Sequence, residues 1–396
     1  MLNLTTLLSS VPQPADALRY GKGHGAPTTA GERKPIVVWN ITRQCNLRCL
    51  HCYSDSEARS YPGELSWEEC RAVVDDLAAY GVPGLLLSGG EPLVHPRVEE
   101  LAAYAKEKGL RVTLSTNGTL IDRERAERLK EIGFAYVGIS LDGIGATHDH
   151  FRGKEGAFQK AVEAFRHCRA VGQRVGLRLT LTRHTIGDLE NILDFIEAEG
   201  IDRVCFYHLV PSGRGVDLAR VSPDALRGAV NSIIARVRRW EREKRTCEVL
   251  TVAQPADAAH LLLRLEAENS PRLEEVRRLL EWNGGGNAGP GIGIANIDSQ
   301  GRVHPDQFWQ DVDLGSVRER PFSEIWSRPS HPLLRELRNR QAHLKGRCGA
   351  CRWIKICGGG FRVRAWRTTG DAWESDPGCY LTEAEVARPQ EAAASL

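Results

Sequence analysis

Three cysteines, Cys45, Cys49 and Cys52, fall within the stretch "CNLRCLHC". A structural zinc site usually takes four ligands from two separated pairs, so zinc would need a distant fourth residue here. An iron–sulfur cubane that only carries electrons is held by four thiolates. Three thiolates leave one iron with an open coordination position, where a substrate can bind and react. The spacing therefore favours a catalytic iron–sulfur cluster over zinc.

A second set of cysteines lies near the C-terminus. Its spacing, C-x2-C-x5-C followed by one more distant cysteine, can close a metal site fully, and from the residues alone zinc and [4Fe–4S] both remain open. The other four cysteines of the chain are scattered, and we expect them to pack as small apolar side chains. The second set comprises Cys348, Cys351, Cys357 and Cys379.

Composition is that of a globular protein, with 396 residues, 41% hydrophobic and 26% charged. The length allows one large domain with a smaller one attached. The sequence has no apolar run of the ~18 residues that a membrane span needs. The start, "MLNLTTLLSS", lacks a basic leader and a cleavage site, so no signal peptide is expected. We therefore expect a cytoplasmic protein with no membrane partner, in which cysteines stay reduced.

Basic residues are concentrated between residues 318 and 367, with eleven Arg and two Lys against three Glu. Such a segment indicates an anionic partner, or simply a solvated face. Arginine forks bind carboxylates and aromatic faces stack on planar rings, which favours a flat, polyanionic ligand. A patch between metal ligands is poorly shaped for a long RNA backbone, so no nucleic-acid partner is expected. The interleaved aromatic residues are Trp326, Trp353, Phe361 and Trp366.

Short β-rich runs alternate with helical stretches from residue 36 onward. Most runs are continuously apolar, as expected for strands buried on both faces. Six βα units in series predict an α/β fold whose parallel sheet is open or curled into a partial barrel, with chemistry at the C-terminal ends of the strands. Those ends carry "SGGEP", "STNG", "SLDG" and "YHLVPSGRG". The expected strands are 36–42, 84–90, 111–117, 136–142, 174–182 and 203–210.

The pattern divides the chain into four parts. Residues 1–35 are expected to be an extended arm, 36–220 the (βα)6 core and 221–290 a helical connection that ends in a glycine-rich linker. Residues 291–396 hold the second cysteine set. Within them we expect a β-hairpin that turns at 299–301 and two short helices near 321–339.

The first cysteine motif, with an aromatic His51 before its last cysteine and "GGEP" one βα unit later, resembles that of radical S-adenosylmethionine (SAM) enzymes. The resemblance implies a partial (βα)6 TIM-like barrel in which Cys45, Cys49 and Cys52 hold a catalytic [4Fe–4S] cluster. It also implies that SAM chelates the open iron and is cleaved to a 5′-deoxyadenosyl radical, which abstracts a substrate hydrogen. A zinc or purely redox site is the alternative.

The same resemblance implies a set of SAM contacts at the strand ends. Gly89, Gly90 and Glu91 would meet the methionine ammonium, with Glu91 as a charge-assisted acceptor. The ribose would contact Ser140 and Asp142, and Arg178 would pair with the methionine carboxylate. Adenine would pack on His51 and on backbone near His208 and Val210. For Arg178 and His208 a hydrogen-bonded core position is the alternative.

The segment from Cys348 to Cys379 resembles the C-terminal extension called the SPASM domain, which in full holds two auxiliary clusters. Cysteines of the first are expected where this chain has Asp306 and Phe361, and an upstream pair is absent. The resemblance therefore implies one auxiliary [4Fe–4S] cluster, ligated by all four cysteines of the second set and suited to electron transfer. Asp306 could be an unusual cluster or substrate contact.

Five segments together resemble radical SAM enzymes that modify tetrapyrroles: "PADALRYGK", "KPIVVWNITRQCNLRCLHCY", "VCFYHLVPSGRG", "VHPDQFW" and "KGRCGACRWIKICGGGFRVRA". One such activity removes the two acetate side chains of 12,18-didecarboxysiroheme to give Fe-coproporphyrin III in haem biosynthesis. Another installs the oxo groups of haem d1 on the same substrate. "DALRYG" and "VCFYHLV" favour the deacetylase.

The tetrapyrrole resemblance implies an iron tetrapyrrole substrate and an electron donor such as ferredoxin or flavodoxin. Candidate axial ligands of the substrate iron are His24 and His304, since imidazole suits iron; a hydrogen-bonded loop histidine is the alternative for each. Candidate arginines for the substrate carboxylates, each alternatively a surface charge, are Arg214, Arg347, Arg352, Arg362 and Arg364.

Two other functions remain open from the sequence. A radical peptide maturase would be favoured by a peptide-docking domain before the first strand, and residues 1–35 look too short for one. A non-catalytic metal-binding or electron-transfer protein would leave SAM uncleaved.

Overall fold

The computed structural model describes residues 1–9, 13, 16–20, 34–218, 220–284 and 289–388. All six predicted strands are present and pair in parallel, in chain order. Their alternation with helices confirms the predicted α/β fold with a curved, parallel sheet. They are β2(Ile36–Asn40), β3(Leu85–Ser88), β4(Val112–Thr116), β5(Tyr136–Ser140), β6(Val175–Leu181) and β7(Arg203–His208).

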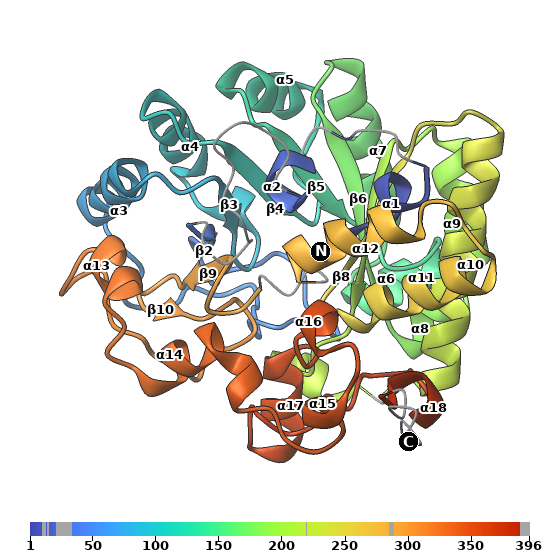
Figure 1. Cartoon of the computed structure of the whole chain (residues 1–396). Helices are drawn as coiled ribbons and strands as arrows, with labels where there is room; N and C mark the ends of the chain where they lie inside the picture. The colour runs from blue at the N-terminus through green and yellow to red at the C-terminus, as the bar shows by residue number, and fades with distance from the viewer. Residues whose placement is uncertain (10–12, 14–15, 21–33, 219, 285–288, 389–396) are drawn as a thin grey trace, which may run out of the picture.

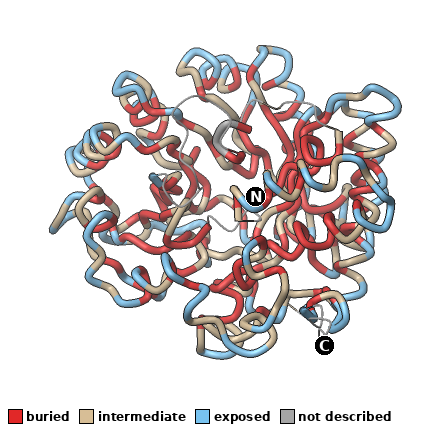
Figure 2. The backbone as a smooth tube through the Cα atoms, viewed as in Figure 1, coloured by how far each residue is buried: buried red, intermediate tan, exposed pale blue. Residues whose placement is uncertain are grey.

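Helices cover the outer face of this sheet in an arc (Figure 1). The longer of these helices bury an apolar side, such as Val73, Val74 and Leu77 of the first, and leave charged side chains in solvent. Buried residues accordingly gather inside the arc and exposed ones on its rim (Figure 2). The helices are α3(Trp67–Tyr80), α4(Val98–Glu107), α5(Arg123–Ile132), α6(Ala146–Arg152), α7(Ala157–Ala170), α8(Arg183–Ile186), α9(Leu189–Ala198) and α10(Pro223–Arg242).

The sheet extends beyond the six predicted strands. β8(Glu248–Val252) pairs in parallel with β7, so the prediction that residues 221–290 form a helical connection is wrong at this strand. β1(Leu2–Asn3) adds to β8 in antiparallel fashion and leads into α1(Leu4–Ser9). The described start of the chain is therefore not an extended arm: Leu2, Leu4 and Leu7 are buried in the core.

The other edge of the sheet receives the predicted hairpin. β9(Ile294–Ile297) pairs in parallel with β2, and β10(Val303–His304) returns antiparallel to β9. At the turn Gly301 has a φ of 83°, a left-handed conformation that glycine adopts without strain. The two helices predicted near 321–339 are present as α13(Phe322–Ser327) and α14(Pro332–Arg338).

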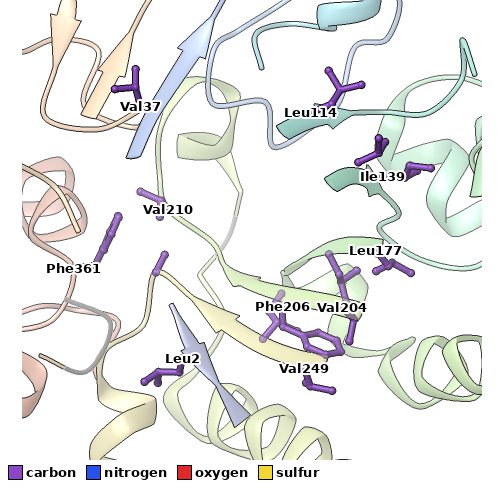
Figure 3. Packing of buried hydrophobic residues seen from close by; sticks show 14 of the residues in the cluster. Leu2, Val37, Leu114, Ile139, Leu177, Val204, Phe206, Val210, Val249 and Phe361 are labelled. Carbon is purple, nitrogen blue, oxygen red and sulfur yellow. The ribbon is translucent and has the colours of Figure 1, made fainter. Parts of the chain in front are cut away.

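The remaining helices close the structure around the strand ends. The C-terminal part, orange to red in Figure 1, lies along the side of the barrel that the outer arc leaves open. A continuous apolar core joins it to the barrel and includes Val210 and Phe361 (Figure 3). No helix in the described ranges could cross a membrane. The remaining helices are α2(Asp16–Tyr20), η2(Pro92–Val94), η3(Gly213–Asp217), α11(Ala256–Ala267), α12(Leu273–Asn283), η4(Arg340–Ala342), α15(Gly346–Ala350), α16(Ile354–Cys357), α17(Arg362–Thr369) and α18(Glu383–Val386).

Candidate active site and metal centres

An open cavity of about 160 Å³ lies at the C-terminal ends of the parallel strands. This is the end of such a sheet where ligands bind. The cavity gathers most of the sequence-predicted cofactor residues from separate parts of the chain. Those that line it are Cys45, Cys49, His51, Cys52, Gly89, Gly90, Ser140, Arg178, His208 and Val210.

The three-cysteine loop is held by backbone contacts that leave its thiols facing this cavity. The N–H of Cys45 donates to the Glu57 carbonyl at 2.9 Å, and Arg214 Nε donates to the Cys49 carbonyl at 2.8 Å. Burial, followed by the nearby Glu91, raises the pKa of the Cys45 thiol to about 12. Metal binding would therefore have to displace a proton from the Cys45 thiol. Three thiols from one rigid loop on one cavity fit a cluster with an open iron.

Gly89 and Gly90 allow the C-terminal end of β3 to pack closely against the cysteine loop. Gly90 N–H donates to the Thr42 carbonyl at 2.8 Å. A Cβ at Gly90 would overlap the Gln44 carbonyl, and one at Gly89, where φ is 148°, would overlap that of Thr42. The glycines are needed for this packing, and they still leave backbone on the cavity wall.

Glu91 does not face the cavity, so its expected side-chain contact with the methionine ammonium is not supported. Its carboxylate is fully buried and accepts from Thr116 Oγ1 at 2.7 Å, Asn117 N at 2.7 Å and Leu93 N at 3.1 Å. These donors occupy both oxygens. Glu91 therefore positions the neighbouring strand end.

Asp142 is likewise turned away from the cavity, contrary to its expected ribose contact. It is fully buried, forms an ion pair with Arg152 and accepts from Thr180 N at 2.7 Å. Arg152, which sequence reasoning missed, lines the cavity and donates to Cys49 Sγ at 3.6 Å. Burial lowers the pKa of the neighbouring His51 to about 4, so its ring is neutral.

Arg178 is a cation on the cavity wall. It donates to the Tyr207 hydroxyl, and its guanidinium lies 4.9 Å from the centre of that ring. In the described part of the chain no carboxylate forms an ion pair with it. It is therefore available to a ligand carboxylate.

His208 is buried at the end of β7, with its Nε2 3.1 Å from Asp257 Oδ2. Asp257 also accepts from the Tyr380 hydroxyl at 2.7 Å. His208 therefore has both features that the sequence left as alternatives: it is hydrogen-bonded in the core, and it lines the cavity. Nδ1 has no partner among the described residues.

A second, smaller cavity is lined by Cys348, Cys351, Cys357 and Cys379. Arg347 Nη1 donates to Cys379 Sγ at 3.2 Å, and the N–H of Asp376 donates to Cys348 Sγ at 3.4 Å. Four thiols with such donors fit a fully ligated cluster. Among the described residues, no three His, Cys, Asp or Glu side chains gather as ligands of a single metal ion.

The arginines expected to grip substrate carboxylates are engaged elsewhere, and none lines the larger cavity. Arg214 holds the cysteine loop and Asp55, while Arg352 lies over Trp353 near Glu266. The others lie near the second cavity. Arg347 donates a hydrogen bond to Cys379 Sγ, Arg362 donates to backbone carbonyls, and Arg364 forms an ion pair with Asp376. Charge counting could not reveal these partners.

The histidines and Asp306 also differ from expectation. His304 is buried, with Nδ1 2.7 Å from the Val312 carbonyl and Nε2 3.4 Å from Asp298, so neither nitrogen is free to bind iron. His24 lies outside the described residues. Asp306 lines neither cavity; it is buried, and its carboxylate accepts from Phe308 N at 2.9 Å.

Several cavity residues were not singled out from the sequence, because no spacing assigns them a role, although Ser88, Asn117 and Tyr207 lie in the strand-end segments quoted above. Arg152 ends a helix, and Tyr53 merely follows the last cysteine. Gln307 and Phe308 come from a loop more than two hundred residues away from the cysteines. Their position depends on the hairpin joining β2. The cavity residues that received no individual assignment include Tyr53, Ser88, Asn117, Arg152, Tyr207, Gln307 and Phe308.

Two family models match the chain: the radical SAM superfamily over residues 39–196 and the SPASM iron–sulfur cluster-binding domain over 291–352. The Fe-coproporphyrin III synthase of Methanosarcina barkeri is 46% identical, covering 98% of this chain and 99% of that protein. The pre-heme d1 synthase of Dinoroseobacter shibae is 45% identical, covering 90% of this chain and 88% of that protein. The AdoMet-dependent heme synthase of Nitratidesulfovibrio vulgaris is 33% identical, covering 90% of this chain and 95% of that protein.

Solved structures share the fold. SuiB of Streptococcus suis bound to S-adenosylmethionine has a TM-score of 0.67 at 18% identity, covering 88% of this chain and 77% of that one. Native anSMEcpe with bound AdoMet has a TM-score of 0.66 at 19% identity, and the match covers 87% of this chain and 93% of that one. These matches support a barrel with a C-terminal extension.

Proposed function

The chain belongs to the radical SAM superfamily, and from this premise we propose that it removes the two acetate side chains of 12,18-didecarboxysiroheme to give Fe-coproporphyrin III. The 46% identity to an Fe-coproporphyrin III synthase over nearly the full length of both proteins carries this proposal. Such coverage includes the barrel, the hairpin loop and the second cysteine set together.

In this proposal Cys45, Cys49 and Cys52 hold the catalytic [4Fe–4S] cluster. Bound there, the cluster supplies the electron that cleaves SAM to a 5′-deoxyadenosyl radical. The chain's own residues bind and orient the reactants. Arg152 stabilises thiolate charge at Cys49, and Arg178 receives the methionine carboxylate.

The remaining SAM contacts are assigned to backbone and neutral groups on the cavity wall. Gly89 and Gly90 present backbone to the methionine ammonium, and Ser140 offers its hydroxyl to the ribose. Neutral His51 and the strand end at His208 and Val210 pack on adenine and exclude water from the site.

The second cysteine set is proposed to hold the auxiliary [4Fe–4S] cluster and to transfer electrons. Because all four thiols converge on one cavity, no position is reserved for substrate there. The external donor would be a ferredoxin or flavodoxin of the cytoplasm.

Product identification tests the proposal. Anaerobically reconstituted protein, SAM, a reductant and 12,18-didecarboxysiroheme should give Fe-coproporphyrin III by mass spectrometry. A product with oxo groups in place of propionates would move the assignment to haem d1 synthesis, which the 45% identity to a pre-heme d1 synthase makes the second candidate. Unchanged tetrapyrrole despite SAM cleavage would reject both.

A further inference from the structure

One wall of the larger cavity comes from the C-terminal part of the chain. Of the described residues that line it, all belong to the barrel except Gln307 and Phe308, which follow β10. One side of the cavity is therefore formed by a short loop, residues 306–309, that lies outside the barrel.

This loop is held in place by contacts within the chain. Asp306 Oδ1 accepts from Phe308 N at 2.9 Å, and Trp309 is fully buried. The Phe308 carbonyl accepts from Ser212 Oγ at 2.9 Å and from Arg367 Nη2 at 3.3 Å. A loop held on both sides presents its side chains with little entropic cost on binding.

Phe308 is the middle ring of three that connect the two cavities. Its centroid lies 5.3 Å from that of Tyr53, which follows Cys52, and 6.1 Å from that of Phe361, which follows Gly360 on the second cavity. Both contacts are edge-to-face, with interplanar angles of 67° and 78°. Phe308 itself is only half-buried, so part of its ring surface remains open to the larger cavity.

Gln307 places an amide beside this ring. Its Oε1 is buried and has no hydrogen-bond partner among the described residues, although the residue lines the cavity. A buried amide oxygen without a partner is costly, and a ligand that pairs with the amide removes this cost. Rotation about the last side-chain bond presents the NH2 group to an acceptor instead.

We propose that Phe308 packs against the face of the tetrapyrrole macrocycle and that Gln307 donates from its amide to one of the substrate's carboxylates. This inference rests on the proposed function. A planar ring with carboxylates on its rim needs an apolar surface beside a polar donor, which this pair supplies. The arginines first expected in this role are engaged elsewhere, and Arg178 is assigned to SAM.

Two probes separate the contributions of the two side chains. Fe-coproporphyrin III carries free carboxylates and its tetramethyl ester carries none, and both are titrated by absorbance into anaerobically reconstituted protein. Phe308→Leu should weaken both probes about three- to tenfold, because only the ring contact is lost. Gln307→Leu should weaken the acid about tenfold and leave the ester within twofold.

Phe322→Leu is the matched control. Phe322 is a buried ring of the same C-terminal part, stacked on Trp326, and it lines neither cavity. It should leave both probe affinities unchanged. Iron content and SAM affinity, measured on every variant, should match the wild type and so show that each holoenzyme is intact.

Equal affinity of wild type and Phe308→Leu for both probes would overturn the stacking role. Equal losses of acid and ester in Gln307→Leu would overturn the carboxylate contact. Binding and conversion of the tetrapyrrole by the wild-type protein are measured separately from these variant affinities, so neither result would contradict the proposed function. Failure of the wild type to bind either probe would instead remove the premise.

Discussion

The imidazole Nε2 of His208 lies 3.1 Å from Oδ2 of Asp257, and both side chains are almost completely buried. Burial would raise the pKa of Asp257, but His208, together with hydrogen-bond donors that include Tyr380, holds it below its ordinary value. Tyr380 directly follows Cys379. One buried carboxylate thus connects the end of β7, on the larger cavity, to the second cysteine set.

Loss of this carboxylate should affect both sites. Asp257→Asn should lower the free energy of unfolding by about 3 kcal/mol, because His208 and Tyr380 lose a charged partner in the interior. SAM affinity should fall as well, since the strand end at 208–210 loses its anchor. Tyr380→Phe, which keeps the ring, should cost only about 1 kcal/mol. Urea unfolding and SAM titration of the holoenzyme measure both effects; unchanged SAM affinity in Asp257→Asn would contradict the link.

Arg152 and Asp142 should show strong coupling in a double-mutant cycle. Asp142 is fully buried and Arg152 nearly so, so Arg152→Met or Asp142→Asn alone leaves one charge unpaired, at a cost of about 3–5 kcal/mol. The double variant should cost clearly less than the sum. Arg152→Met should also lower the reduction potential of the first cluster, because Cys49 loses a charged donor.

Arg236→Met provides the control for this cycle. Arg236 is also largely buried, but two of its three carboxylate partners, Glu190 and Asp194, are 63% and 68% exposed. Water can therefore solvate them when the arginine is lost. Additive losses in the Arg152 and Asp142 cycle, or an equal shift of potential in Arg236→Met, would argue against the assigned role.

The sequence predicted the six-strand core because continuous apolar runs mark strands buried on both faces. It missed β1 because the pairing of β1 with β8 joins segments about 250 residues apart, a distance that no local pattern reports. It missed β8, which pairs with the preceding strand β7, because this five-residue run was interpreted as part of a helical stretch. The cysteines and glycines were found because their spacing indicates cluster ligands and close backbone contact with a cofactor. Glu91 and Asp142 stand at strand ends as expected, yet their directions depend on donors supplied by Thr116, Asn117 and Arg152.

Iron content should separate the two cysteine sets. The reconstituted protein should bind about eight irons from two cubanes. Replacing Cys45, Cys49 and Cys52 by Ala should leave about four irons and abolish SAM cleavage. Replacing the second set by Ala should also leave about four, with SAM cleavage retained. Replacement of the buried Cys70 and Cys168, which line neither cavity, should change neither quantity. A full iron count in either cluster variant would reject the ligand assignment.

Asp306 should make stability depend on pH near neutrality. Burial raises the pKa of this carboxyl from 3.8 to about 7. Between these values the unfolded chain ionises Asp306 while the native state keeps it protonated, so stability falls as pH rises and levels off above about 7. At about 1.4 kcal/mol per pH unit, the total is about 4 kcal/mol. Asp306→Asn keeps an acceptor for Phe308 N–H and should remove this slope.

The matched control is Asp313→Asn. Asp313 accepts from Gly315 N at 2.8 Å, two residues ahead, just as Asp306 accepts from Phe308 N, but it is exposed. Urea midpoints of the anaerobic holoenzyme between pH 5 and 8 measure the slopes. The stability of wild type and of Asp313→Asn should fall by the same amount as pH rises toward 7. The stability of Asp306→Asn should fall less steeply, so that this variant becomes the most stable of the three. Parallel curves for all three proteins would mean that Asp306 is ionised in the native state across this range, and its burial would then require a cation beside it.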